Sequence, residues 1–100
     1  MDAAQDAVDA AKGDLAVAKA ERNVAQKNVK HAKQALRKAK KRHHGVAAAR
    51  RELRAARGEM RVANAKVRAE QGKVNRANDR LAAAQAELEA AQQALEDAQK

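Results

Sequence analysis

The side chains of this chain that could do chemistry are almost all charged. Its 100 residues include 22 Lys and Arg, 13 Asp and Glu and three His, and they contain no Cys, Ser, Thr or Tyr. Because covalent catalysis usually starts from a hydroxyl or thiol group, only carboxylates and histidines remain as candidate catalytic residues.

The carboxylates are densest near the C-terminal end, at Glu87, Glu89, Glu96 and Asp97. In a chain of helix-forming residues they fall on a solvated helix surface, where charged side chains serve solubility and pair with neighbours one turn away. We therefore predict no catalytic site and no enzyme activity.

The histidines do not follow a metal-ligand pattern. His43 and His44 are adjacent, so on a helix their side chains point about 100° apart, and His31 lies three turns earlier. We predict no metal site and no cofactor, and we expect His43 and His44 to help end a helix.

Composition limits the fold to helices. The chain has no aromatic residue and no Pro, and its hydrophobic residues are mostly alanine. Ala, Leu, Glu, Gln, Lys and Arg are strong helix formers, and a chain dominated by them is typical of a long helix or a coiled coil. No apolar stretch approaches the roughly 20 residues of a membrane span. The absence of Cys leaves the cellular compartment unknown.

Apolar residues recur at two positions of a seven-residue repeat in both halves of the chain. The a series reads Val8, Leu15, Arg22, Val29 and Leu36, and then Val46, Leu53, Met60, Val67, Val74, Leu81, Leu88 and Leu95. The d series reads Ala4, Ala11, Ala18, Ala25, Ala32 and Ala39, and then Ala49, Ala56, Ala63, Glu70, Ala77, Ala84, Ala91 and Ala98. This pattern predicts a coiled-coil seam, with small d residues that allow close approach as in an alacoil. It also argues against disorder, which the net charge of +9 would otherwise suit.

The repeat slips by three residues after Leu36, where residues 40–45 read KKRHHG. Cations followed by a glycine that can adopt the left-handed C′ conformation indicate a helix end. The sequence therefore predicts an all-α fold, a single two-helix antiparallel coiled-coil hairpin over residues 1–100 that reverses near His43 and Val46. We expect helix 1 at about 3–43, the turn at about 44–46 and helix 2 at about 47–99.

An antiparallel pair places the a residues of one helix opposite the d residues of the other. A reversal near Gly45 then places Leu36 opposite Ala56, and it places Arg22 opposite Glu70, the two charged residues of the seam. We predict that Arg22 and Glu70 set the register, because a shift by one heptad would leave each charge unpaired. Alternatively, both long side chains reach out of a narrow seam into water.

The same register has consequences at the edge and at the end of the seam. It places Glu21 beside Lys73, and it leaves Leu95 and Ala98 without a partner in helix 1. Either an additional helix covers Leu95 and Ala98, or helix 1 begins upstream of Met1. We therefore interpret the chain as a piece of a longer coiled coil.

A competing architecture is one continuous helix in a parallel dimer, with the phase slip at 43–46 as a local irregularity of the supercoil. It would place Gly45 inside a helix at a cost of about 1 kcal/mol. It also gives no reason for Arg22 and Glu70 to face each other.

Positive charge is concentrated around the predicted turn. Residues 23–61 contain thirteen Lys and Arg against two Glu, whereas residues 62–100 are neutral. We name nine of these cations the basic tip: Lys33, Arg37, Lys40, Lys41, Arg42, Arg50, Arg51, Arg54 and Arg57. Like charges repel, so the cluster either binds a partner with negative charge or only keeps the protein in solution. The partner is expected to be a protein or an anionic surface. Nucleic acid is the alternative, bound through phosphates because no aromatic residue is present to stack on bases.

Two stretches, LAAAQAELEAAQQAL at 81–95 and LAVAKAE at 15–21, resemble the alanine-rich helical-hairpin arms of colicin-type bacteriocins and the coiled-coil stalks of other bacterial toxins. The resemblance implies a rigid arm that holds a toxic domain away from a receptor-binding tip, and a secreted or cell-surface location. The shape and tip charge also resemble the basic helical arm of seryl-tRNA synthetases. The favoured hypothesis is a non-catalytic spacer and binding arm with a basic tip. The alternatives are a nucleic-acid-binding arm and a purely structural stalk.

The predicted Arg22–Glu70 pair can be tested with a double-mutant cycle. Arg22→Ala and Glu70→Ala should each lower the free energy of unfolding, whereas the double variant should lose less than the sum, by about 0.5 kcal/mol or more. Urea denaturation followed by circular dichroism measures all three. Additive losses would rule out the predicted pair.

Overall fold

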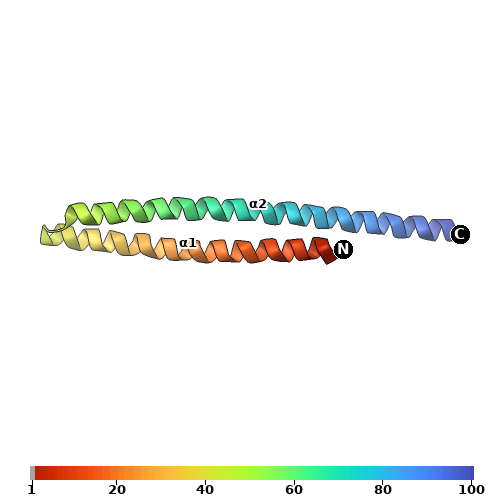
Figure 1. Ribbon diagram of the computed structural model, residues 1–100, viewed down its shortest axis with the longest axis horizontal. Helices are drawn as coiled ribbons and strands as arrows, with labels where there is room; N and C mark the ends of the chain where they lie inside the picture. Colours follow the sequence, from red (N-terminus) through yellow and green to blue (C-terminus); the bar gives the residue numbers. More distant parts are fainter. Residues whose placement is uncertain (1) are drawn as a thin grey trace. The chain divides into compact units, whose positions relative to one another are not determined.

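The computed structural model describes residues 2–100, and these residues form two α-helices joined by a short turn (Figure 1). Helix α1 spans Asp2–Arg42 and helix α2 spans Val46–Gln99. No strand occurs within residues 2–100. The predicted all-α two-helix hairpin is therefore confirmed. Helix α1 ends one residue earlier, and α2 begins one residue earlier, than the sequence predicts.

The packing contacts divide the hairpin into two units. The turn-proximal unit is Ala16–Ala69, which holds the turn and the parts of both helices that adjoin it. The terminal unit consists of residues up to Leu15 packed against Glu70–Lys100. In each unit a segment of α1 packs against a segment of α2.

The seam of each unit is built from the predicted a and d positions. In the turn-proximal unit the buried side chains are Ala18, Ala25, Ala32, Ala49, Leu53, Ala56, Ala63 and Val67. In the terminal unit they are Val8, Leu15, Val74 and Ala77. No polar or charged residue is classed as buried within residues 2–100. The contact between the helices therefore consists of many small apolar layers, most of which contain alanine.

Beyond Ala84, the a and d side chains of the terminal unit are exposed. Leu88 has 44% and Leu95 has 61% of its surface exposed to solvent. The register that places Leu36 opposite Ala56 also places Leu88 opposite Ala4. This pairing is wrong, because a residue so exposed is not covered by a facing helix.

The register in the turn-proximal unit differs from the predicted one. Each residue of α1 faces a residue of α2 that lies closer to the turn than predicted. Ala32 packs with both Leu53 and Ala56, and Val29 and Leu36 pack against this cluster. With α1 ending at Arg42 and α2 beginning at Val46, the reversal is centred on His44. Ala32 and Ala56 are equally distant from His44 along the chain, so the observed contact follows from the position of the turn.

An ion pair across the seam supports this register. Lys66 Nζ lies 2.9 Å from Glu21 Oε2 and also donates to Glu21 Oε1 at 3.2 Å. The predicted pairing of Glu21 with Lys73 is wrong, and Lys73 instead pairs with Glu70 of its own helix at 3.3 Å. Both pairs have exposed lysine ends, so each contributes well under about 1 kcal/mol.

Arg22 and Glu70 are both partly buried. Arg22 Nε and Glu70 Oε2 are shielded from solvent and have no hydrogen-bond partner among residues 2–100. Arg22 belongs to the turn-proximal unit and Glu70 to the terminal unit, and their pairing stays a prediction.

The turn contains two residues in the left-handed conformation, His43 with φ 52° and Gly45 with φ 72°. The N–H of His44 donates to the carbonyl of Ala39 at 3.2 Å, and the N–H of His43 donates to that of Lys40 at 3.3 Å. These two bonds form a Schellman motif, with His43 at the left-handed C′ position. The sequence places Gly45 there, and that assignment is wrong. Gly45 instead caps the N-terminus of α2, since its carbonyl accepts the N–H of Ala49 at 3.0 Å.

The left-handed backbone at His43 makes a stability prediction. A residue with a Cβ is strained there and glycine is not, so His43→Gly should raise the free energy of unfolding by about 0.5 to 1 kcal/mol. Urea denaturation followed by circular dichroism provides the measurement.

Two other variants serve as controls for this prediction. His44 has no positive φ, so His44→Gly should destabilise slightly through the greater freedom of the unfolded chain. Gly45→Ala should destabilise by about 1 kcal/mol because alanine is strained at positive φ. A loss of stability in His43→Gly would show that the turn does not need a left-handed residue at this position.

Candidate functional site

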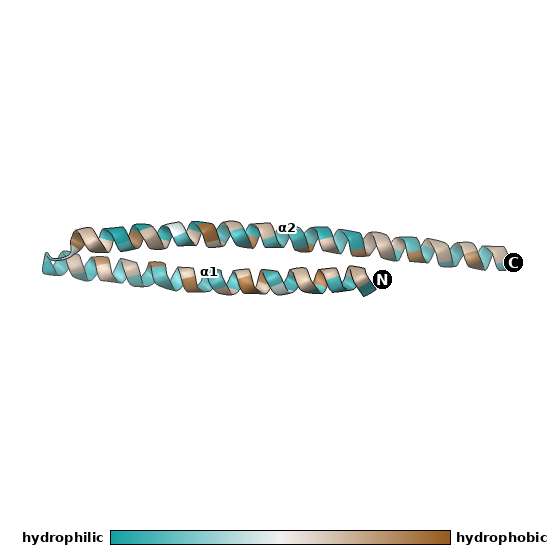
Figure 2. Cartoon of the chain, viewed as in Figure 1, coloured by the Kyte–Doolittle hydropathy of each residue, from teal (hydrophilic) through white to brown (hydrophobic). Residues whose placement is uncertain are grey.

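The structure brings the nine residues of the basic tip together around the turn. All nine lie in the turn-proximal unit and all are exposed. From α1 come Lys33, Arg37, Lys40, Lys41 and Arg42, and from the first turns of α2 come Arg50, Arg51, Arg54 and Arg57. In Figure 2 the end of α1 that leads into the turn is hydrophilic.

No residue of the basic tip is neutralised by a carboxylate. None of the nine forms an ion pair or a side-chain hydrogen bond with another residue in the range 2–100. Glu52 and Glu59, the two carboxylates of the same region, form no ion pair with a described residue either. The cationic groups therefore point into solvent and are available to an external anion.

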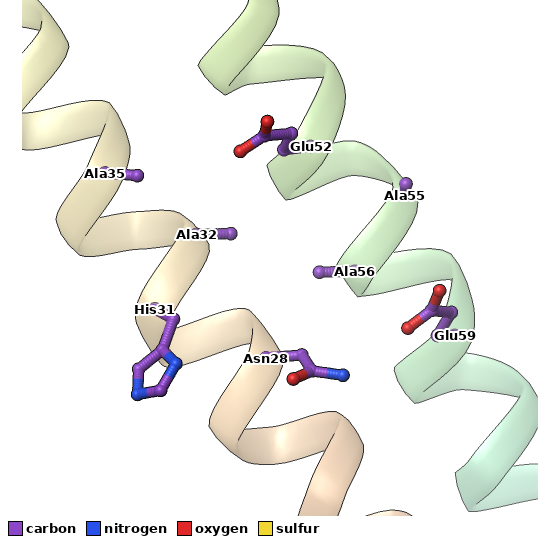
Figure 3. Close-up of a pocket in the computed structure, with 8 residues that line it drawn as sticks. All are labelled: Asn28, His31, Ala32, Ala35, Glu52, Ala55, Ala56 and Glu59. Carbon is purple, nitrogen blue, oxygen red and sulfur yellow. The ribbon is translucent and has the colours of Figure 1, made fainter.

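Glu52 and Glu59 line an open groove of about 410 Å³ on one side of the seam (Figure 3). Asn28 and His31 of α1 line the groove opposite them, and Ala32 and Ala56 point toward one another between the helices. A second groove of about 340 Å³ continues from it between Val24 and Val62. Both grooves lie on the same side of the hairpin, because Asn28 and Glu59 belong to both linings.

The two carboxylates that line the first groove lie far apart. Glu52 and Glu59 are seven residues apart, which separates them by about 10 Å along the helix axis, further than two carboxyl groups that act on one bond. No group of three His, Cys, Asp or Glu in residues 2–100 could hold a metal ion. Neither described helix is long and apolar enough to cross a membrane.

The exposed cations of the turn-proximal unit form a larger pattern than the nine residues predicted. Heptad positions b and e are three residues apart, so they form one stripe on a helix. We name this stripe, taken from both helices, the cationic edge: Lys19, Lys30, Lys33, Arg37, Lys40, Arg50, Arg54, Arg57, Arg61 and Arg68. Lys19, Lys30 and Arg68 were not identified from the sequence, although their heptad positions could have revealed them.

The cationic edge faces away from the grooves. Asn28, Ala35, Glu52 and Glu59 are all at position g, and they line the groove between the helices. Positions e and g flank the seam on opposite sides, so the e residues of both helices lie on the side away from this groove. All three carboxylates of Ala16–Ala69, at Glu21, Glu52 and Glu59, are at g. We name their side the carboxylate edge.

Comparison of the chain with protein-family models, with curated proteins and with solved structures gives no match.

Unpaired cations at the tip predict an unusual response to salt. Raising NaCl from about 20 mM to about 500 mM shortens the screening length and weakens repulsion among the exposed cations. We expect the free energy of unfolding to rise by about 1 kcal/mol, since several like-charge pairs each contribute about 0.2 to 0.5 kcal/mol.

Urea denaturation at the two salt concentrations measures this response. A variant with Arg50, Arg54 and Arg57 changed to Gln should respond less, because it carries fewer repelling charges. A parent protein that loses stability in salt would mean that attractive ion pairs outweigh repulsion.

Proposed function

We propose that the protein is a non-catalytic helical arm that presents its basic tip to a partner of negative charge. The single observation that carries the proposal is the group of nine exposed tip cations that have no carboxylate partner among residues 2–100. A partner that supplies negative charge would relieve the repulsion among them.

The hairpin suits a presenting role. Buried apolar side chains at the a and d positions form the seam, and the charged tip lies where the chain reverses. A spacer needs a stiff connection and an end that contacts something else, which is also what the resemblance to toxin arms implies. The partner class of this proposal is a molecule or surface of negative charge. A protein receptor or an anionic surface, at a secreted or cell-surface location, is the form that the toxin resemblance implies, and nucleic acid is the alternative.

A purely structural stalk is the main competing function. In that case the tip charge only keeps an alanine-rich helix pair in solution, and any arrangement of the same net charge would serve. The two functions differ in whether the position of the cations matters.

Retention on immobilised heparin, a generic sulfated polyanion, tests this difference. The tip variant carries Arg50→Gln, Arg51→Gln, Arg54→Gln and Arg57→Gln. We expect it to elute at least about 100 mM NaCl earlier than the parent protein, because contacts to a polyanion release counterions in proportion to the charges engaged.

A matched control also removes four positive charges, but from residues far from the turn. It carries Lys12→Gln, Arg76→Gln, Arg80→Gln and Lys100→Gln, all at exposed positions. This variant should elute close to the parent protein. Equal shifts in the two variants would contradict the binding arm and favour the structural stalk.

A further inference from the structure

The turn-proximal unit has two chemically different edges. The cationic edge carries ten Lys and Arg, and its other residues are alanines and the neutral amides Asn23, Gln26 and Asn64. The carboxylate edge carries Glu21, Glu52 and Glu59 and the two grooves, together with two cations, Arg42 and Lys66, of which Lys66 pairs with Glu21. Segregation of this kind is not needed for solubility, since mixed charges would serve solubility equally well and would repel less.

The cations of the cationic edge lie in two rows that run side by side. Lys30, Lys33, Arg37 and Lys40 follow one another at helical spacing on α1, and Arg50, Arg54, Arg57 and Arg61 do so on α2. Each row spans about 15 Å along its helix. Packed helices have axes about 8 to 10 Å apart, so the rows present a band of positive charge to one side of the hairpin.

We propose that the cationic edge binds double-stranded nucleic acid through its phosphate backbone, a proposal that rests on the binding-arm function and names its partner. A duplex carries one phosphate per strand about every 3.4 Å, so a 15 Å row faces four or five phosphates of one strand. The row on α2 consists of arginines, whose guanidinium groups bind phosphate with two hydrogen bonds. Asn23, Gln26 and Asn64 add neutral donors to phosphate and sugar oxygens.

Two other polyanions fit the edge less well. A single strand is held mainly by stacking of its bases on aromatic side chains, and this protein has none. A membrane surface favours cations flanked by large apolar side chains that enter the lipid. The exposed valines Val17, Val24 and Val62 occupy position c on the carboxylate edge, where insertion would bring Glu21 and Glu59 against anionic lipid.

Two variants of equal charge test which edge binds. The edge variant carries Lys33→Gln, Arg37→Gln, Arg54→Gln and Arg57→Gln. The off-edge variant carries Lys27→Gln, Lys38→Gln, Arg42→Gln and Arg51→Gln, which also removes two lysines and two arginines from exposed positions near the turn. Circular dichroism verifies that both variants remain helical. Two single variants repeat the comparison, Arg54→Gln on the cationic edge and the neighbouring Arg51→Gln off it.

The measurement is fluorescence anisotropy of a labelled 20-base-pair duplex, as DNA and as RNA, titrated with each protein over a range of salt concentrations. We expect the edge variant to lose at least tenfold in affinity. The magnitude of the slope of log affinity against log salt should fall by about 3.6 for four lost phosphate contacts, at about 0.9 for each contact. The off-edge variant should lose less than threefold and keep the slope of the parent protein.

Three results would overturn the proposal. Equal losses in the two variants would show that net charge alone attracts the duplex. Tighter binding of the parent protein to vesicles rich in phosphatidylserine than to the duplex would assign the edge to a membrane surface. Failure of the parent protein to bind the duplex at low salt, while heparin still distinguishes the tip variant from its control, would reject nucleic acid but leave the binding arm intact.

Discussion

The alanines at the d positions are the constraint on which the rest of this hairpin depends. Residues such as Ala25, Ala32, Ala56 and Ala63 are buried between the helices, and their size allows the backbones to approach closely. Burying a methyl group contributes only about 0.8 kcal/mol, so each layer of the seam stabilises the fold by a small amount. The stability of the hairpin must therefore be the sum of small contributions from many layers along both helices. The turn and the surface charge each contribute about 1 kcal/mol to the free energy of unfolding, and such contributions therefore matter more here than in a protein with a large hydrophobic core.

A seam this narrow also determines where chemistry can occur. It occupies two of the seven heptad positions, and within residues 2–100 it leaves no polar or charged residue classed as buried. Except for Arg22, which is partly buried, the charged groups of the turn-proximal unit consequently lie on exposed surfaces, where hydration competes with every contact. A single exposed charge therefore contributes little binding energy, and a charged surface binds its partner through the number and spacing of its charges. Two edges of opposite character on one hairpin are the clearest chemical asymmetry that this arrangement provides.

The fold could be predicted in detail from the sequence, and the candidate site only in part. Periodicity identified Val8, Leu53 and Val67 as seam residues, because helix geometry fixes which positions share a face. The partners across the seam were harder to predict. Glu21 pairs with Lys66 and not with Lys73, since the antiparallel register depends on where the chain reverses, and a small error at the turn shifts every facing pair. The cations of the basic tip followed from the sequence, but only the structure shows that the grooves lie on the side with the carboxylates.

The sequence by itself determined that the chain forms two helices with an alanine seam and a positively charged reversal, because helix propensity and a seven-residue repeat act locally along the chain. Only the tertiary structure decided how the reversal is made. His43 adopts the left-handed conformation that ends α1, and Gly45 caps α2. The reason is that the three turn residues must satisfy both helix ends at once while the seam brings Ala32 against Ala56. That combined requirement involves residues that are far apart in the sequence, so no local sequence pattern could predict it.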